Sequence, residues 1–226
     1  MCRLLAYAAP RPVAVESLIG ADQCVSYRLM ARLHDDGWGT AWTTDGRADG
    51  EPGEVRGVRT VRPGYDDDQL AALMDRPLAR ARLLHLRLAT DTLAVTEVNS
   101  HPFLADGLAF AHNGSIAPMD DLRAMVGPAA IADVLGTTDS ELYFALIRQE
   151  LAAGGEMAAG GEPAAGGELA AAVSRAVGAI RRAYPVASLN AVLLSPTHLV
   201  VVHSSGAAPV PWHHFGALSA EHLPAG

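Results

Sequence analysis

Met1-Cys2-Arg3-Leu4-Leu5-Ala6-Tyr7 opens the chain, and the rest of the sequence is best understood from this stretch. The apolar residues 3–8 behind the cysteine predict a buried strand, which Pro10 and Pro12 are expected to end. Removal of Met1 would leave a thiol and a free α-amine on the same carbon. Such a pair is a self-contained nucleophile and base. The alternative is that Cys2 is an ordinary residue.

The composition fits a soluble globular protein of one domain across residues 1–226, with half of the residues hydrophobic. The net charge of −8 and the pI near 5.5, without a basic run of five residues or more, argue against a nucleic-acid partner. Apolar stretches fall short of the ~18–20 residues that span a bilayer, and the opening residues make a poor secretory signal. We therefore expect a cytoplasmic protein without a membrane partner.

The two cysteines, Cys2 and Cys24, do not make a disulfide framework. Cys24 falls within a helical apolar pattern over residues 13–33, which Gly20 divides, and is expected to be a small core residue. Neither a Cys-x-x-Cys nor a His-Glu-x-x-His spacing occurs, so we expect no metal site and no cofactor.

Asp36-Gly37-Trp38-Gly39 leads into a β-like segment. The glycines fit either a close approach of the backbone to a ligand or a plain hairpin turn. Farther along, residues 81–89 predict a core strand that contains the charged Arg87. Because a buried charge needs a partner, either a structural carboxylate or a substrate carboxylate is expected beside Arg87.

Residues 108–111 predict another core strand, which runs into His112-Asn113-Gly114. Asn-Gly at a strand end is a hairpin signal. It also supplies two hydrogen-bond donors, the Asn113 side-chain amide and the Gly114 main-chain N–H, of the kind that an oxyanion hole requires. Thr138 or Asp139 is expected to be the N-cap of the next helix.

Residues 152–169 repeat Ala-Ala-Gly-Gly-Glu-x three times and predict a surface linker between two helices. Strands are expected at 188–194 and 198–203, before a tail from Gly206. Strands thus come early, in the middle and late, without βαβ alternation. This order favours an α+β fold with a largely antiparallel sheet core.

The motifs together resemble the class II glutamine amidotransferases, and the resemblance covers nearly the whole chain except the repeat and the tail. The opening Met-Cys-Arg-Leu-Leu and Asp36-Gly37-Trp38-Gly39 resemble the stand-alone branch, which includes the γ-glutamyl amide hydrolase of ergothioneine biosynthesis. The other matching motifs, in chain order, are Arg87-Leu-Ala-Thr90, Asn99-Ser-His101-Pro102, His112-Asn113-Gly114 and Thr138-Asp139-Ser140-Glu141.

The resemblance implies an αββα sandwich of the N-terminal nucleophile (Ntn) hydrolases, with two mainly antiparallel sheets between helix layers. It implies that Cys2 is the nucleophile and its own α-amine the general base. The oxyanion hole would consist of Asn113 and Gly114.

For the substrate, the resemblance implies that Arg87, with Thr90 beside it, holds the α-carboxylate of a glutamine-like group. Asp139 would hold the α-ammonium. Asp91 stands where many amidotransferases of this class carry His, which leaves the acyl substituent and the leaving amine open.

The expected reaction is cleavage of a γ-glutamyl amide, either glutamine or a γ-glutamylated metabolite, through a γ-glutamyl thioester. Because the chain ends before a synthase domain could begin, it would either act alone or supply ammonia to a separate synthase partner. A homo-oligomer and a binding module without turnover also stay open. The residues that match the family motifs would contact only the glutamyl half of the substrate, so they do not identify the leaving amine.

Overall fold

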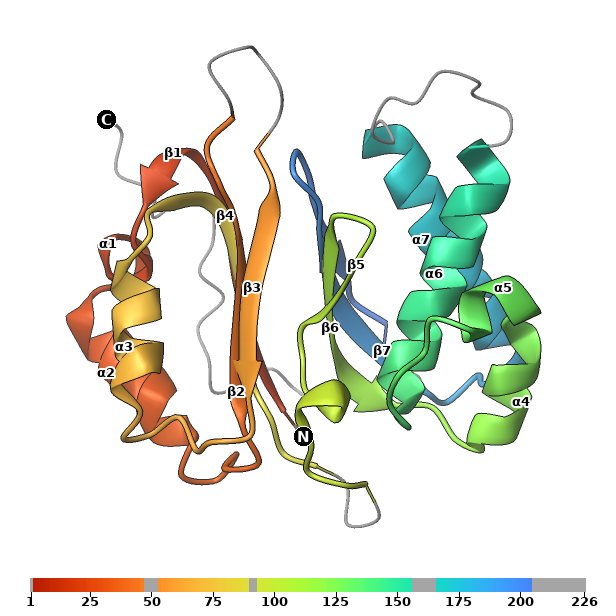
Figure 1. Ribbon diagram of the computed structural model, residues 1–226, viewed down its shortest axis with the longest axis horizontal. Helices are drawn as coiled ribbons and strands as arrows, with labels where there is room; N and C mark the ends of the chain where they lie inside the picture. The colour runs from red at the N-terminus through yellow and green to blue at the C-terminus, as the bar shows by residue number, and fades with distance from the viewer. Residues whose placement is uncertain (1, 47–52, 90–92, 156–165, 205–226) are drawn as a thin grey trace.

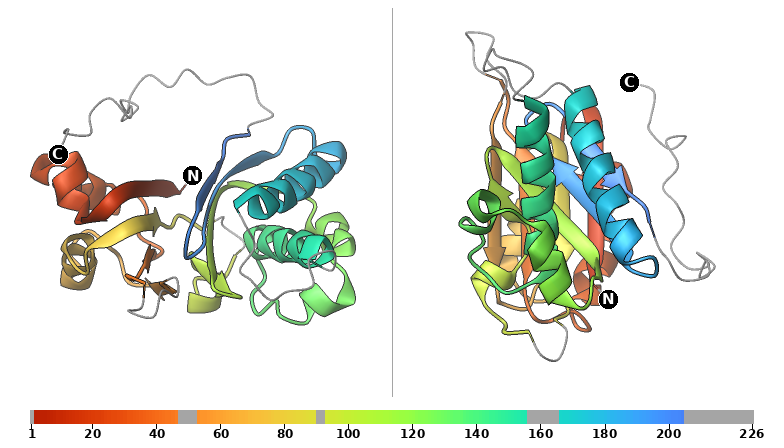
Figure 2. Two further views of the ribbon diagram at one scale, coloured as in Figure 1. Left: turned by 90° about the horizontal axis from the view of Figure 1, so that it is seen from above. Right: turned by 90° about the vertical axis from the view of Figure 1, so that its right-hand side faces the viewer.

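The computed structural model describes residues 2–46, 53–89, 93–155 and 166–204. Two four-stranded antiparallel sheets lie face to face, and helices cover both outer faces (Figures 1 and 2). The elements in chain order are β1 (Arg3–Val13), α1 (Val15–Ile19), α2 (Ala21–Met30), β2 (Trp38–Thr43), β3 (Val55–Thr60), α3 (Asp68–Asp75), β4 (Ala79–Leu86), η1 (Glu97–Asn99), β5 (Phe103–Ala105), β6 (Leu108–Ser115), α4 (Met119–Met125), α5 (Pro128–Ile131), α6 (Asp139–Gly155), α7 (Gly166–Ala183), β7 (Ser188–Leu194) and β8 (Leu199–Val202).

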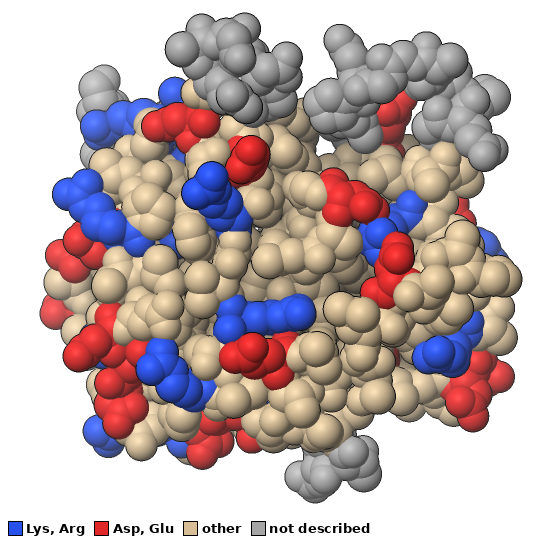
Figure 3. Space-filling view, in the orientation of Figure 1, with Lys and Arg blue, Asp and Glu red and all other residues tan. Residues whose placement is uncertain are grey.

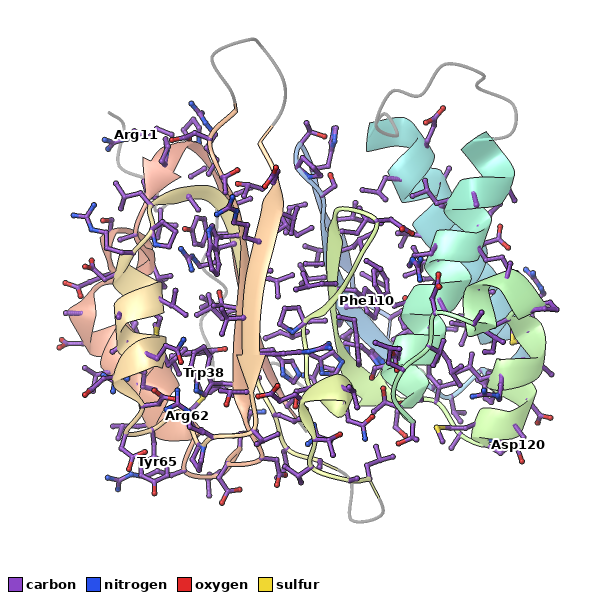
Figure 4. The ribbon with its side chains drawn as sticks, in the orientation of Figure 1. Arg11, Trp38, Arg62, Tyr65, Phe110 and Asp120 are labelled. Carbon is purple, nitrogen blue, oxygen red and sulfur yellow. The ribbon has the colours of Figure 1, made fainter. Side chains whose placement is uncertain are left out.

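The first sheet has the strand order β1-β4-β2-β3 and is covered by α1, α2 and α3 (Figure 1). Trp38 of β2 is fully buried in the core between this sheet and its helices, where Cys24 also lies (Figure 4). The Trp38 indole N–H donates to Asp67 at 3.0 Å, so the polar edge of this large side chain is satisfied. The expected core position of Cys24 is confirmed.

The second sheet has the order β5-β6-β7-β8 and is covered by α4 to α7 (Figures 1 and 2). Phe110 of β6 points toward α6 (Figure 4), where its ring stacks on Phe144 and meets the edge of Tyr143. All three rings are buried. They fix the position of α6 on the sheet, and therefore the position of the first residue of α6, Asp139.

Small side chains fill the layer between the two sheets. Ala41, Ala81, Ala109 and Ala111 form a buried cluster there with larger aliphatic side chains from β4 and β7. Because side chains alternate along a strand, each strand presents one face to this layer and the other to its helices. The predicted sandwich of two antiparallel sheets between helices is confirmed.

Strand β1 is longer than the sequence predicts. It continues through Pro10 and Pro12 to Val13, with a register shift between Ala8 and Val13. Proline is tolerated because β1 is the edge strand of its sheet, so the missing N–H groups break no hydrogen-bond ladder. The prediction that these prolines end the strand is wrong.

Asn113 and Gly114 do not form a hairpin. Both lie within β6 and pair with Asn190 and Leu189 of β7. The turn lies before β6, where Asp106 and Gly107 both have positive φ, as a tight two-residue hairpin turn requires.

The predicted linker over 152–169 is too long. Residues 152–155 complete α6 and residues 166–169 begin α7, while 156–165 lie outside the described residues. Alanine and glutamate are good helix formers, which explains why the ends of the repeat join the helices. The expected tail from Gly206 also lies outside the described residues.

Acidic and basic side chains are interspersed on the face shown in Figure 3. No described helix combines the length and the apolar character that crossing a membrane requires.

Candidate active site

Four chain segments from both sheets and one helix layer meet at the lower end of the molecule in Figure 1: the start of β1, the end of β4, the end of β6 and the start of α6. The antiparallel register Arg3↔Leu86 brings the start of β1 beside the end of β4, and β1 packs against β6 across the layer between the sheets. This junction therefore collects Cys2, Arg87, Asn113 and Asp139.

Strand alternation sets the direction of the Cys2 side chain. Leu4 and Ala6 pack into the layer between the sheets, whereas Leu5 and Tyr7 face the helices. Cys2 is on the same face as Leu4, so its thiol points toward the second sheet. The side chain is half-buried.

The Cys2 sulfur contacts the main chain of Leu88 twice. The Leu88 N–H donates to Sγ at 3.4 Å, and the thiol donates to the Leu88 carbonyl, also at 3.4 Å. Burial raises the pKa of the Cys2 thiol, the Leu88 bond and the charge of Arg87 oppose that rise, and the charge of Asp139 adds to it. A thiol with a raised pKa needs a base to become a nucleophile at neutral pH.

Arg87 is buried, with 3% of its surface exposed. Its Nη2 donates to the Ala94 carbonyl at 3.2 Å, while Nη1 is buried and has no hydrogen-bond partner among the described residues. Burial lowers the pKa of the Arg87 guanidinium, and the negative charge of Asp36 opposes that change. The structural carboxylate that the sequence left open is not found as an ion pair of Arg87 in the described part of the chain.

Asn113 and Gly114 occupy the last part of β6. Ala109 and Ala111 of the same strand belong to the cluster between the sheets, so alternation turns the Asn113 side chain into that layer as well. The Asn113 Oδ1 atom is buried without a partner among the described residues. Gly114 is needed because a Cβ there would collide with the main-chain oxygen of Ser188.

Asp139 is the first residue of α6, and its carboxylate is held on both oxygens. Oδ2 accepts from the Ile116 N–H at 2.7 Å, and Oδ1 accepts from the Ser140 N–H at 2.8 Å. Thr138 is the N-cap, since its Oγ1 accepts from the Glu141 N–H. Asp139 is thus free of the capping role that the sequence also allowed.

His112 supports this arrangement from the helix side of β6. Its ring nitrogens are 2.9 Å from Ser140 Oγ and 2.9 Å from the Ser188 carbonyl, which ties β6 to α6 and to β7. Burial lowers the pKa of His112, and the charge of Asp139 opposes that shift.

A cavity of about 200 Å³ lies beside the start of α6 and is lined by Thr137, Thr138, Met119, Asp120, Arg123, Gly136 and Leu142. Cys2, Arg87 and Asp139 do not line it. It is therefore a neighbour of the junction and not the space above the thiol.

The described part of the chain contains no cluster of three or more His, Cys, Asp or Glu side chains that could hold a metal ion. What the junction presents is a thiol, a guanidinium with one unused nitrogen, a side-chain amide whose oxygen has no partner among the described residues, and a fixed carboxylate. These groups suit acyl transfer from a substrate that carries both charges of an amino-acid head group.

Residues 1–209 match the profile of a protein family described as Glutamine amidotransferases class-II. The chain belongs to the class II glutamine amidotransferases. A solved glutamine aminotransferase class-II domain protein from Silicibacter pomeroyi has a similar fold, with a TM-score of 0.58 and 23% identity over 92% of this chain and 78% of the other.

Glutamine phosphoribosylpyrophosphate amidotransferase from B. subtilis, solved with ADP and GMP, is also similar, with a TM-score of 0.55 and 14% identity over 90% of this chain and 37% of the other. At these identities the likeness is one of fold. The family resemblance drawn from the motifs is confirmed. This class II amidotransferase is an Ntn-type enzyme. The chemistry of its family is hydrolysis of the glutamine amide and transfer of ammonia.

Of the site residues expected from the sequence, the structure of the amidotransferase brings Cys2, Arg87, Asn113 and Gly114 to the junction, with Asp139 at its helix side. Thr90, like Asp91, lies outside the described residues. The sequence did not reveal the part played by the Leu88 main chain, because a backbone contact leaves no mark on residue identity. The sequence assigns Asp36 no role of its own, beyond its place in the Asp36-Gly37-Trp38-Gly39 motif.

Proposed function

We propose that this class II amidotransferase cleaves a γ-glutamyl amide, with Cys2 as the nucleophile. The thiol attacks the γ-carbonyl carbon, the amide C–N bond breaks, and the amine leaves with a proton. Water then hydrolyses the γ-glutamyl thioester and restores the thiol. The base is the α-amine of Cys2 after removal of Met1, since an α-amine titrates near ~8, close to working pH.

The observation that carries the proposal is the state of Arg87. The Nη1 atom of Arg87 is buried and has no hydrogen-bond partner among the described residues. The residue that follows Arg87 in the chain, Leu88, contacts the Cys2 sulfur through its main chain. A buried guanidinium nitrogen without a hydrogen-bond partner costs free energy. A substrate carboxylate would supply the missing hydrogen-bond acceptor. The α-carboxylate of a glutamyl group matches this need.

The other groups complete the recognition of a glutamyl substrate. Asp139 offers a carboxylate to the α-ammonium, and we propose that Thr90, which lies outside the described residues, binds the α-carboxylate together with Arg87. The Asn113 amide and the Gly114 N–H would stabilise the oxyanion of the tetrahedral intermediate, where loss of one donor costs about 10²–10³ in rate.

For the leaving amine we propose a γ-glutamylated metabolite, as in the ergothioneine-type branch, with glutamine as the competing candidate. Release of glutamate by the purified, Met-processed chain from a panel of γ-glutamyl amides separates the two. We expect turnover of a γ-glutamyl metabolite to exceed that of glutamine. The Cys24→Ala variant is the matched control, because Cys24 lies in a helix-side core away from the junction.

Glutamine as the preferred substrate would instead favour the ammonia-supplying subunit, whose turnover should rise with a synthase partner. Absence of glutamate release from every amide, with an intact fold, would contradict the proposal and favour a binding module.

A further inference from the structure

We propose that Asp36 is a positioning residue that fixes the main chain of residues 87–89, so that the Leu88 N–H supports the Cys2 thiolate. The inference rests on the proposed role of Cys2 as nucleophile. It adds a residue that acts on the reaction through the backbone and that does not touch the substrate.

Three hydrogen bonds join the Asp36–Gly37 segment to the chain beyond β4. The Asp36 carboxylate accepts from the Ala89 N–H at 2.7 Å, and the Asp36 N–H donates to the Arg87 carbonyl at 3.3 Å. The Gly37 carbonyl accepts from the Arg87 N–H at 2.8 Å. Residues 87 and 89 are therefore both held from the side of Asp36.

Leu88 lies between these two held residues, and its N–H and carbonyl point the opposite way, to the Cys2 sulfur. This is the pattern of an extended chain, in which the N–H and carbonyl of one residue face one neighbouring strand and those of the next residue face the opposite one. Rotation of the peptide between residues 87 and 88 would break the hydrogen bond from the Asp36 N–H to the Arg87 carbonyl and turn the Leu88 N–H away from the Cys2 sulfur. The Ala89 bond of Asp36 holds the other side of Leu88.

The conformation of the Asp36–Gly37 segment is itself fixed by glycine. Gly37 has a φ of 123°, a region that other residues rarely adopt, and a Cβ there would collide with the Thr60 carbonyl. The carboxylate of Asp36 is half-buried beside a rigid turn, which favours a single geometry.

The influence of Asp36 on the thiol passes through the main chain. Burial raises the pKa of the Cys2 thiol and the Leu88 hydrogen bond lowers it, and the described side chains whose charges act on it are Arg87 and Asp139. Removing the Asp36 side chain should therefore raise the thiol pKa by weakening the Leu88 bond. A second effect falls on Arg87, since the charge of Asp36 holds up the pKa of that guanidinium.

The test measures how fast iodoacetamide alkylates Cys2 as a function of pH in the full, Met-processed chain, with peptide mapping to separate Cys2 from Cys24. The variants are Asp36→Ala and Asp36→Asn. The controls are Asp35→Ala and Asp35→Asn, which make the same change at the exposed neighbouring carboxylate. Thermal unfolding of each variant monitors the fold.

We expect Asp36→Ala to slow Cys2 alkylation about tenfold at pH 7, as loss of a charge-assisted hydrogen bond predicts, and to lower kcat for the γ-glutamyl substrate by a similar factor. Asp36→Asn keeps a neutral acceptor, so about a threefold loss is expected. If Asp36→Ala does not fold, the rate of Cys2 alkylation in Asp36→Asn tests the positioning role instead.

Alkylation profiles that match the Asp35 controls, together with an unchanged kcat, would overturn the positioning role even if thermal stability falls. Cys2→Ala separates this outcome from failure of the proposed function. If Cys2→Ala is inactive while the Asp36 variants behave like their controls, only the positioning role is lost. If Cys2→Ala stays active, the proposed function itself is lost.

Discussion

Asp139, the first residue of α6, accepts a 2.7 Å hydrogen bond on Oδ2 from the main-chain N–H of Ile116, the residue that follows β6. The carboxylate proposed to hold the substrate ammonium is thus bound to the strand that carries Asn113 and Gly114. In the proposed function, recognition of the head group and stabilisation of the oxyanion would both depend on this hydrogen bond between α6 and β6.

Asp139→Asn should raise KM for the γ-glutamyl substrate by about 10–100-fold, because the ammonium loses its charged partner. The same variant should lower the pKa of the Cys2 thiol, since the charge of Asp139 raises it. Steady-state kinetics and the pH profile of Cys2 alkylation measure both effects. Asp120→Asn, an exposed acid at the start of α4, is the control. An unchanged KM would remove Asp139 from the binding site.

Arg87→Gln should change the thiol in the opposite direction. Without the guanidinium charge the pKa of Cys2 rises further, and alkylation at neutral pH slows. KM should rise by about 10–100-fold, since the α-carboxylate loses its charged donor. The control is Arg56→Gln, whose side chain is 65% exposed on β3. Equal alkylation profiles for the two variants would contradict the placement of Arg87 beside Cys2.

Gly114→Ala should impair both stability and catalysis, because the new Cβ collides with the Ser188 carbonyl and forces β6 from β7. We expect a loss of about 3 kcal/mol in the free energy of unfolding and a large fall in kcat. Denaturant unfolding and kinetics test this. Gly178→Ala in α7 is the control, because a new Cβ there would come no closer than 3.5 Å to any atom outside the neighbouring helix backbone, and alanine favours the helix. Equal stability of the two variants would contradict the close approach of β6 and β7.

A buried histidine pair should make the fold sensitive to acid. The rings of His85 and His101 lie 4.2 Å apart, and burial lowers the pKa of His85 to about 3 and that of His101 well below its usual range. Histidine in an unfolded chain titrates near ~6.5. Between about pH 6.5 and pH 3 the unfolded chain therefore binds more protons, and stability falls as the pH falls.

Each of these histidines adds up to about 1.4 kcal/mol per pH unit to that slope. His85→Phe should make the free energy of unfolding less dependent on pH between pH 6 and 4, as denaturant titrations at several pH values would show. His198→Phe, at an exposed position, should leave the slope as in the wild type. A slope unchanged in His85→Phe would show that His85 is accessible to protons in the folded state.

The sequence predicted much of the fold because most elements carry local signals. Gly20 separates α1 from α2 as expected, and Asp106-Gly107 forms the turn before β6. The errors came from context. Whether Pro10 and Pro12 end a strand depends on that strand lying at a sheet edge, and whether Asn113-Gly114 turns depends on a partner strand far along the chain.

Side-chain chemistry was easier to predict than backbone chemistry at the site. The side chains that the structure brings to the junction could be named from their motifs, and their roles stay proposals: Cys2, Arg87, Asn113 and Asp139. The contact between Leu88 and Cys2 is made by main-chain atoms and would be compatible with almost any residue at position 88. The bond between Asp36 and Ala89 joins residues 53 positions apart, which no local pattern records.

The most direct test of the central claim, that Cys2 accepts the γ-glutamyl group, is the rate of glutamate release by Cys2→Ala compared with the wild type on the best γ-glutamyl amide. Mass spectrometry should first show that Met1 is absent from the active wild-type enzyme. We predict that Cys2→Ala keeps the fold by circular dichroism and thermal unfolding and releases no glutamate above background. Glutamate release at the wild-type rate by a folded Cys2→Ala variant would contradict the account.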